Sequence, residues 1–174
     1  MEPASAIPLV IIGSARKDGN TREITDAVLQ GIPAKKIDLA NHTILPYSYD
    51  GQYADDDFLY VVDEMLRYQT IIFATPVYWY AMSGAMKIFL DRFTDLVTLQ
   101  KEKGRKLKGR NFLLLVVGSD EDLPPGFEIP FSKTADYFDV QYGGGIYLIT
   151  KEKYPDIHSE EAIIFRQKLQ SGII

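Results

Sequence analysis

The sequence predicts an α/β protein in which a parallel β-sheet lies between two layers of helices. Three continuous apolar runs, at residues 7–13, 70–75 and 111–118, have the length and composition of strands that are buried on both faces. The segments between these runs repeat apolar residues with the period of a helix. Strands that alternate with helices join through right-handed crossovers, which build a three-layer α/β sandwich.

Two further runs bring the predicted strands to five. Residues 144–150 form a weaker apolar run, and residues 34–40 form a short and more polar one. Three helical segments each present one regular face: Ile24, Ala27, Val28 and Gly31; Phe58, Val61, Val62, Met65 and Leu66; Ala85, Met86, Phe89, Leu90, Phe93 and Val97. A fourth has a less regular stripe: Ala162, Ile163, Phe165, Arg166 and Leu169. No linker or repeat divides the chain, so residues 1–174 are expected to form one domain.

The composition is that of a globular protein and excludes several classes of function. Hydrophobic residues make up 46% of the chain, charged residues make up 25%, and the formal net charge is -5. The one basic stretch, at residues 101–110, joins a helix to a strand, so we expect no basic face and no nucleic-acid partner. The chain has no cysteine, which excludes disulfides, thiolate zinc sites, iron–sulfur clusters and cysteine nucleophiles.

Neither the histidines nor the acidic run predicts a metal site. His42 and His158 lie far apart in the sequence and have no metal-ligand spacing. The three adjacent aspartates at 55–57 precede a helix, where carboxylates cap the helix and complement its dipole. We therefore expect no bound metal ion.

The uncharged stretch from Tyr68 to Met86 approaches the length of a membrane span. It also contains glutamine, threonine, serine, proline and glycine, so a buried strand, a loop and the start of a helix explain it better. The first dozen residues lack the basic segment of a secretory signal. We therefore expect a cytoplasmic protein without a membrane span.

A ligand of such a sheet binds outside the carboxyl ends of the strands, where the strand order reverses. The first loop that reaches this point is "GSARKDGNT", residues 13–21. Asn20 is the expected N-cap of the following helix, and Glu23 completes a capping box. The helix N-terminus favours a phosphate, and Ser14, Asn20, Thr21 and Arg16 supply further donors.

The spacing of the glycines limits which kinds of phosphate-binding motif this loop can be. Gly13 and Gly19 allow a tight turn, but their separation does not fit a Walker A loop, and the dinucleotide fingerprint G-x-G-x-x-G is absent. The loop therefore predicts a site for a single terminal phosphate. The alternative is a capped strand-to-helix turn that binds nothing.

The second loop brings three aromatic residues to the same point. Pro76 follows the strand at 70–75, and Tyr78, Trp79 and Tyr80 follow Val77. A planar and partly apolar ring needs such a wall, with backbone amides to meet its polar edge. The alternative is that these aromatic side chains pack in the core or at a dimer interface.

The third loop, residues 118–131, follows the strand at 111–118. Gly118 and Ser119 can bring the backbone close to a ring, and the acidic, proline-rich segment 120–125 can border a substrate entrance. The alternative is a long surface connection without a role in binding.

Two of these segments together resemble a known family. "GSARKDGNT" resembles the phosphate loop G-S-x-R-x-x-G-N-T of the NADPH-dependent FMN reductase family, which has the flavodoxin-like fold. "PVYWYAMSGAMKIFLDRF", residues 76–93, resembles that family's segment P-x-Y-W-x-x-x-S-x-x-x-K-x-x-x-D-R. The resemblance spans most of residues 7–150.

The resemblance implies the strand order 2-1-3-4-5, one FMN per subunit, NAD(P)H as reductant and a homodimer. It places the cofactor on the following residues: the phosphate on Ser14, Arg16, Gly19, Asn20 and Thr21, and the ring against Pro76, Val77, Tyr78, Trp79, Gly118 and Ser119. Lys87, Asp91 and Arg92 match the helix that often carries dimer contacts. The cysteines of the related iron–sulfur flavoproteins are missing, so a cluster is excluded.

The leading hypothesis is an FMN-dependent NAD(P)H oxidoreductase. The flavin would take hydride from the nicotinamide and pass it to a small-molecule acceptor such as a quinone, an azo compound or a free flavin, with no catalytic side chain required. Two alternatives stay open: a flavodoxin-like electron carrier, and a non-catalytic flavin-binding or interaction module.

Overall fold

The computed structural model describes residues 5–53, 56–150 and 157–171. Its central sheet has five parallel strands in the order β2-β1-β3-β5-β6, which confirms the predicted order 2-1-3-4-5. The strands are β1 (Leu9–Ile12), β2 (Lys35–Asp38), β3 (Thr70–Tyr78), β5 (Asn111–Gly118) and β6 (Gln141–Ile149). The strand order reverses at β1, because β2 lies on one side of β1 and β3, the next strand, lies on the other. This switch point fixes the edge of the sheet at which a ligand can enter.

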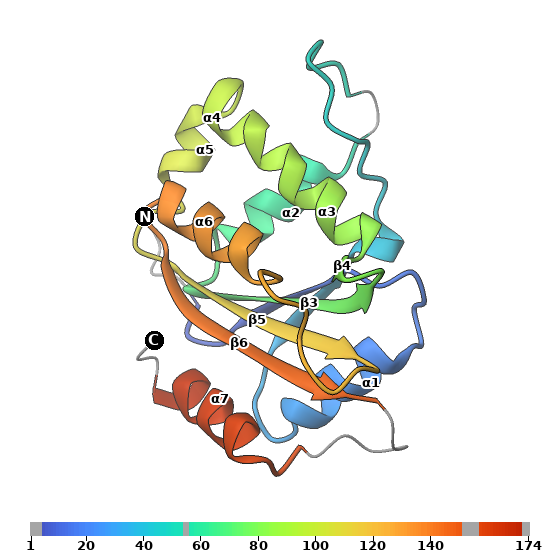
Figure 1. The fold of residues 1–174 in the computed structure, drawn as a ribbon. Helices are drawn as coiled ribbons and strands as arrows, with labels where there is room; N and C mark the ends of the chain where they lie inside the picture. Colours follow the sequence, from blue (N-terminus) through green and yellow to red (C-terminus); the bar gives the residue numbers. More distant parts are fainter. Residues whose placement is uncertain (1–4, 54–55, 151–156, 172–174) are drawn as a thin grey trace.

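Helices cover both faces of the sheet, as predicted (Figure 1). One face carries α1 (Asn20–Val28) and α7 (Glu160–Ser171). The other face carries α2 (Phe58–Met65), α3 (Gly84–Asp91), α4 (Asp95–Thr98), α5 (Lys101–Arg105) and α6 (Ile129–Tyr137). Two short 3₁₀ helices, η1 (Leu39–Asn41) and η2 (Arg92–Thr94), continue β2 and α3.

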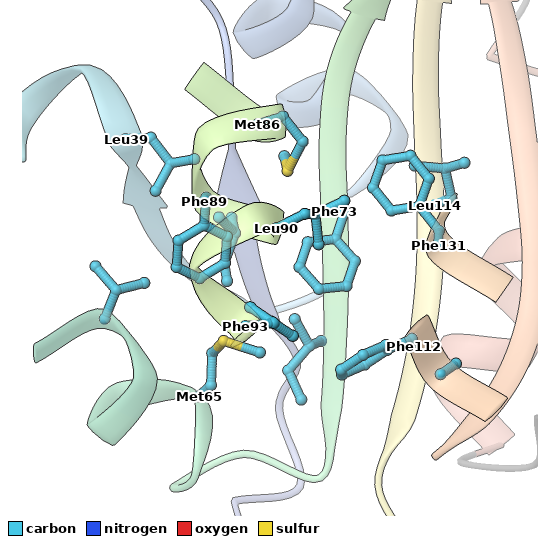
Figure 2. Close-up of a cluster of buried hydrophobic side chains, with 14 of the residues drawn as sticks. Leu39, Met65, Phe73, Met86, Phe89, Leu90, Phe93, Phe112, Leu114 and Phe131 are labelled. Atoms are coloured by element: carbon cyan, nitrogen blue, oxygen red, sulfur yellow. The ribbon is translucent and has the colours of Figure 1, made fainter. Parts of the chain in front are cut away.

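Alternate residues of the strands belong to two separate hydrophobic cores, one on each face of the sheet. In β1, Leu9 and Ile11 pack under α2, α3 and α6, whereas Val10 and Ile12 pack against α1 and α7. All four are fully buried, which explains why the strand reads as an unbroken apolar run. Figure 2 shows the larger core, in which phenylalanines of α3, β3, β5 and α6 meet. Phe73 and Phe112 lie edge to face with their ring centroids 4.9 Å apart.

The strand after the second crossover is longer than predicted. β3 continues through Pro76 to Tyr78 instead of ending at Thr75. β1 ends opposite Ala74, so beyond that point β3 has a free edge where a proline without an N–H group is tolerated. The chain then reverses at Trp79 and Tyr80 into a two-residue strand, β4 (Ala81–Met82), which pairs antiparallel with β3.

Three details of the helices differ from the expectations. Gly19, not Asn20, is the N-cap of α1, and no side chain caps this helix. Gly31 lies beyond the end of α1 with a φ of 81°, so it does not belong to the buried face. The loop predicted at 118–131 ends earlier, because its last three residues, from Ile129, form the first turn of α6.

Candidate functional site

A cleft of about 480 Å³ opens at the carboxyl ends of β1, β3, β5 and β6. The three unusual loops of the sequence converge on it, as the sheet topology requires. Its lining residues are Ser14, Arg16, Gly19, Asn20, Thr21, Pro76, Val77, Tyr78, Val117, Gly118, Ser119 and Thr150.

The cleft contains every predicted cofactor-binding residue except Trp79. Trp79 sits at the tip of the β3–β4 hairpin and is 92% exposed. Val117 and Thr150 line the cleft without having been predicted. Thr150 directly follows β6, so the rule that strand ends converge could have found it.

One end of the cleft is suited to an anion. Among the described residues, the backbone N–H groups of Asn20 and Thr21 at the start of α1 have no acceptor, and no side chain caps the helix. These free donors carry the positive end of the helix dipole. Arg16 is exposed beside them, and its guanidinium forms no hydrogen bond or ion pair within the described part of the chain. Among the described residues of the lining, it is the one that carries a charge.

Arg22 holds the shape of this loop from the first turn of α1. Its Nε donates to the Lys17 carbonyl oxygen at 3.1 Å, and its Nη2 lies 3.7 Å from Oδ2 of the buried Asp38 at the end of β2. The backbone N–H of Arg16 donates to the Ser14 hydroxyl at 3.3 Å. The loop is therefore tied to the sheet through side chains that leave its free donors facing the cleft.

Ser83 links the second wall of the cleft to the first. Its hydroxyl donates to the Gly13 carbonyl oxygen at 2.6 Å and caps α3 by accepting from the Met86 N–H at 3.1 Å. Its own N–H donates to the Thr75 hydroxyl at 3.1 Å. Because Ser83 is 1% exposed, this junction fixes the hairpin of β3 and β4 relative to the end of β1.

Tyr147 of β6 supports the third wall. Its hydroxyl donates to the Asp120 carbonyl oxygen at 2.9 Å and so holds the segment that follows β5. The backbone N–H of Thr150 donates to the Gly118 carbonyl oxygen at 2.8 Å. Burial, and then the nearby Asp120 carboxylate, raise the pKa of Tyr147 above its ordinary value.

The helix segment predicted for dimer contacts divides into an exposed and a buried part. Lys87 and Asp91 form an exposed ion pair at 2.6 Å on α3. Arg92 is instead 2% exposed, and it pairs with Asp56 at 2.6 Å and with Asp95 at 2.7 Å. Its guanidinium also lies 3.3 Å from the centroid of the Tyr53 ring. Arg92 therefore anchors the segment before α2 and has no surface to offer a partner.

The chemistry of the lining fits a bound cofactor better than a side-chain mechanism. The lining residues that the structure describes include no carboxylate, histidine or lysine that could act as a general acid or base. One end offers free amides and a cation for a terminal phosphate, and the other offers Pro76, Val77 and the backbone of Gly118 to a flat, partly apolar group. Among the described residues, no cluster of three or more metal-ligating side chains is present.

Comparison with known proteins gives a family. The family described as NADPH-dependent FMN reductase matches residues 8–122. The chain is also 36% identical over 93 residues to YwqN of Bacillus subtilis, which is provisionally named an NAD(P)H-dependent FMN-containing oxidoreductase. That alignment covers 49% of this chain and 51% of YwqN, so it spans about half the length of each protein.

Solved structures agree with the fold. The Trp repressor binding protein of Bacillus subtilis is 21% identical, with a TM-score of 0.70 over 93% of this chain and 96% of that one. General stress protein 14 of Treponema denticola, solved in complex with FMN, is 19% identical, with a TM-score of 0.69 over 95% of this chain and 98% of that one. In the part of the chain that the structure describes, no helix has the length and apolar character to cross a membrane.

Proposed function

Because this chain belongs to the NADPH-dependent FMN reductase family, we propose that it is an FMN-dependent NAD(P)H oxidoreductase and that residues 1–174 form one FMN-binding domain. The observation that carries the proposal is the cleft itself. A free cation and an uncapped helix N-terminus meet there with a wall of apolar and backbone groups. These features match the two ends of a flavin mononucleotide.

The phosphate of FMN would be held at the start of α1. The free N–H groups of Asn20 and Thr21 would donate to its oxygens, and the Arg16 guanidinium would pair with two of them. Ser14 and Gly19 complete this end of the site. The phosphate would accept the hydrogen bonds that a capping side chain, absent beside the N-cap Gly19, would otherwise accept.

The flavin ring would be held between the second and third walls. Pro76, Val77 and Tyr78 would contact one side of the ring, and Gly118 with Ser119 would contact the other. When bound, FMN supplies the redox chemistry, accepting hydride from NAD(P)H and passing it to the acceptor. The chain's own task is to orient the ring: Ser83 holds one wall and Tyr147 holds the other through fixed hydrogen bonds.

Trp79 has a different role from the one that the resemblance implies. Its position at the exposed hairpin tip places it outside the lining, so it contacts what enters the cleft rather than the cofactor. We expect the electron acceptor to be of the quinone type. We also expect a homodimer whose contacts include the exposed Lys87–Asp91 face of α3. The expected location of the protein is the cytoplasm.

The test is to purify the protein and record its absorbance. The expected result is a yellow protein with one FMN per chain that oxidises NADH or NADPH when a quinone is added. A colourless protein that FMN cannot reconstitute would contradict the proposal. A protein that binds FMN but does not oxidise either nucleotide would be an electron carrier or a binding module instead.

A further inference from the structure

The open end of the cleft is bordered by two segments of contrasting chemistry. Residues 76–82 form the hairpin and carry no charge, and residues 118–125 contain three carboxylates. Neither segment contains a lysine or an arginine. The cation of the lining, Arg16, lies at the phosphate end. Within the described residues, the two ends of the cleft therefore differ in electrostatic sign.

The two bordering segments leave the sheet side by side. Pro76 of β3 is paired with Val117 of β5 in a parallel register. Three residues beyond this pair, at Trp79 and at Asp120, both chains have left the sheet. Tyr78 and Ser119, one residue before, both line the cleft. The aromatic hairpin and the acidic segment thus face the same opening.

The hairpin presents bare aromatic surface to solvent next to the cleft, which its Tyr78 lines. Trp79 is 92% exposed, Tyr80 is 70% exposed, and neither belongs to a core cluster. Exposed aromatic rings stack on planar ligands, and their faces attract cations, with tryptophan the strongest. The hairpin therefore favours a flat ligand and, among flat ligands, one with positive charge.

The acidic segment contributes the same preference independently. The hydrogen bond from Tyr147 to the Asp120 carbonyl oxygen holds the backbone of this segment. The Asp120 carboxylate lies 3.5 Å from the hydroxyl of Ser119, a residue that lines the cleft. Burial, and then the Asp120 and Asp122 carboxylates, raise the pKa of the Tyr147 hydroxyl, so both charges act at this end of β6. Within the described residues, neither carboxylate forms an ion pair.

We propose that the electron acceptor is a planar aromatic compound that bears positive charge, and that the hairpin and the acidic segment select it over anionic acceptors. This inference rests on the proposed function and names the substrate class of that same site. The selection acts at the opening, where the acceptor stacks on Trp79 and enters the field of Asp120 and Asp122. Exposed charges are screened, so the preference is expected to weaken with salt.

Kinetics with two matched acceptors test the selection. One is a naphthoquinone with a trimethylammonium group, and the other is the same quinone with a sulfonate. Each takes up a hydride and a proton and leaves as the hydroquinone, while NAD(P)H becomes NAD(P)⁺. The measured quantity is the ratio of kcat/KM for the cationic quinone to kcat/KM for the anionic quinone. This ratio is compared between the wild type and the double variant Asp120→Asn, Asp122→Asn. The comparison cancels the intrinsic reactivity of each quinone.

The expected result is that the double variant lowers the cation-to-anion ratio about tenfold at low ionic strength and about twofold at physiological salt. The same variant is expected to lower KM for NAD(P)H, which is an anion. The matched control is the double variant Asp63→Asn, Glu102→Gln, which removes the same charge from α2 and α5. The control is expected to leave the ratio unchanged.

A second readout needs no turnover. Trp79 is the one tryptophan of the chain, so its fluorescence reports on the opening alone. Quenching by Cs⁺ is expected to exceed quenching by I⁻ once each is divided by its quenching of free N-acetyltryptophanamide, which corrects for the weaker intrinsic quenching by Cs⁺. The Asp120→Asn, Asp122→Asn variant is expected to reduce that difference, and the α2 and α5 control is not.

The outcomes separate this inference from the proposed function. A protein that turns over both quinones with a ratio that the double variant leaves unchanged overturns the inference and keeps the function. Preferential quenching by I⁻ in the wild type also overturns the inference. Failure to oxidise NAD(P)H with either quinone overturns the proposed function and this inference with it.

Discussion

The hydroxyl of Tyr147 lies where a side chain at position 118 would begin. A Cβ built on Gly118 would be 2.4 Å from the Tyr147 hydroxyl oxygen and 2.8 Å from the nearest ring carbon. The same hydroxyl donates to the Asp120 carbonyl oxygen and so sets the path of the segment that follows β5. The glycine at the edge of the cleft is therefore required by a neighbouring strand and not by a turn.

Gly118→Ala is expected to destabilise the protein by about 1–3 kcal/mol, because the new methyl group displaces the Tyr147 ring. FMN affinity is expected to fall as well, since the loop from Ser119 to Asp120 loses its hydrogen bond. Urea unfolding and FMN titration measure the two effects. Gly84→Ala is the matched control, because a Cβ there meets nothing within 4 Å. Equal stability of the two variants would sink this account.

Arg16→Ala is expected to weaken FMN binding by about 10- to 100-fold, because the phosphate loses a charge-assisted pair of hydrogen bonds. Riboflavin, which has no phosphate, is expected to bind both proteins equally. The stability of the apoprotein is expected to change by less than about 0.5 kcal/mol, since the side chain is exposed and unpaired in the described structure. A loss of riboflavin affinity as large as that of FMN would mean that Arg16 does not hold the phosphate.

Arg92→Met is expected to cost about 3–5 kcal/mol of stability, because Asp56 and Asp95 would remain buried without a cation. Lys87→Met breaks an ion pair on the same helical segment, but that pair is exposed, so a cost below about 1 kcal/mol is expected. Denaturant unfolding of the two variants gives the comparison. Similar costs for both would show that burial does not strengthen the Arg92 pairs.

The sequence predicted the elements whose environment is uniform along their length. β5 is buried at all eight positions, so its apolar run from Asn111 to Gly118 coincides with the observed strand. α6 was not recognised, because prolines and a glycine precede it and its two buried residues, Phe131 and Ala135, give little periodicity. The extension of β3 past Pro76 depends on where β1 ends, and no local pattern contains that information.

Most of the candidate site was predictable from local sequence patterns, but the residues whose position depends on distant parts of the chain were not. The phosphate loop and the strand-end rule brought together residues that do line one cleft. Trp79 was assigned to the wall because its neighbours belong there, but a two-residue turn carries it to the tip of a hairpin. The burial of Arg92 depends on Asp56, which lies 36 residues away in the sequence. Such a long-range partner leaves no local signal.

The turn at Trp79 and Tyr80 carries backbone strain that a substitution can relieve. Their φ angles are 48° and 65°, a region that favours glycine and asparagine and disfavours bulky aromatic residues. Replacing both residues, Trp79→Asn with Tyr80→Gly, is expected to raise the free energy of unfolding by about 1–2 kcal/mol. Turnover with an aromatic acceptor is expected to fall in the same variant, through a higher KM, because the stacking surface at the opening is gone.

FMN affinity separates a local effect from a general one in this variant, since neither replaced residue lines the cleft. FMN affinity is expected to stay within about twofold of the wild type, because the lining residues from β3, β5 and α1 are unchanged. Measuring stability, KM and FMN affinity on one preparation therefore decides whether the strained aromatics are kept for the acceptor. A variant that is less stable than the wild type, or equally active, would show that the two aromatic residues hold the turn and not the substrate.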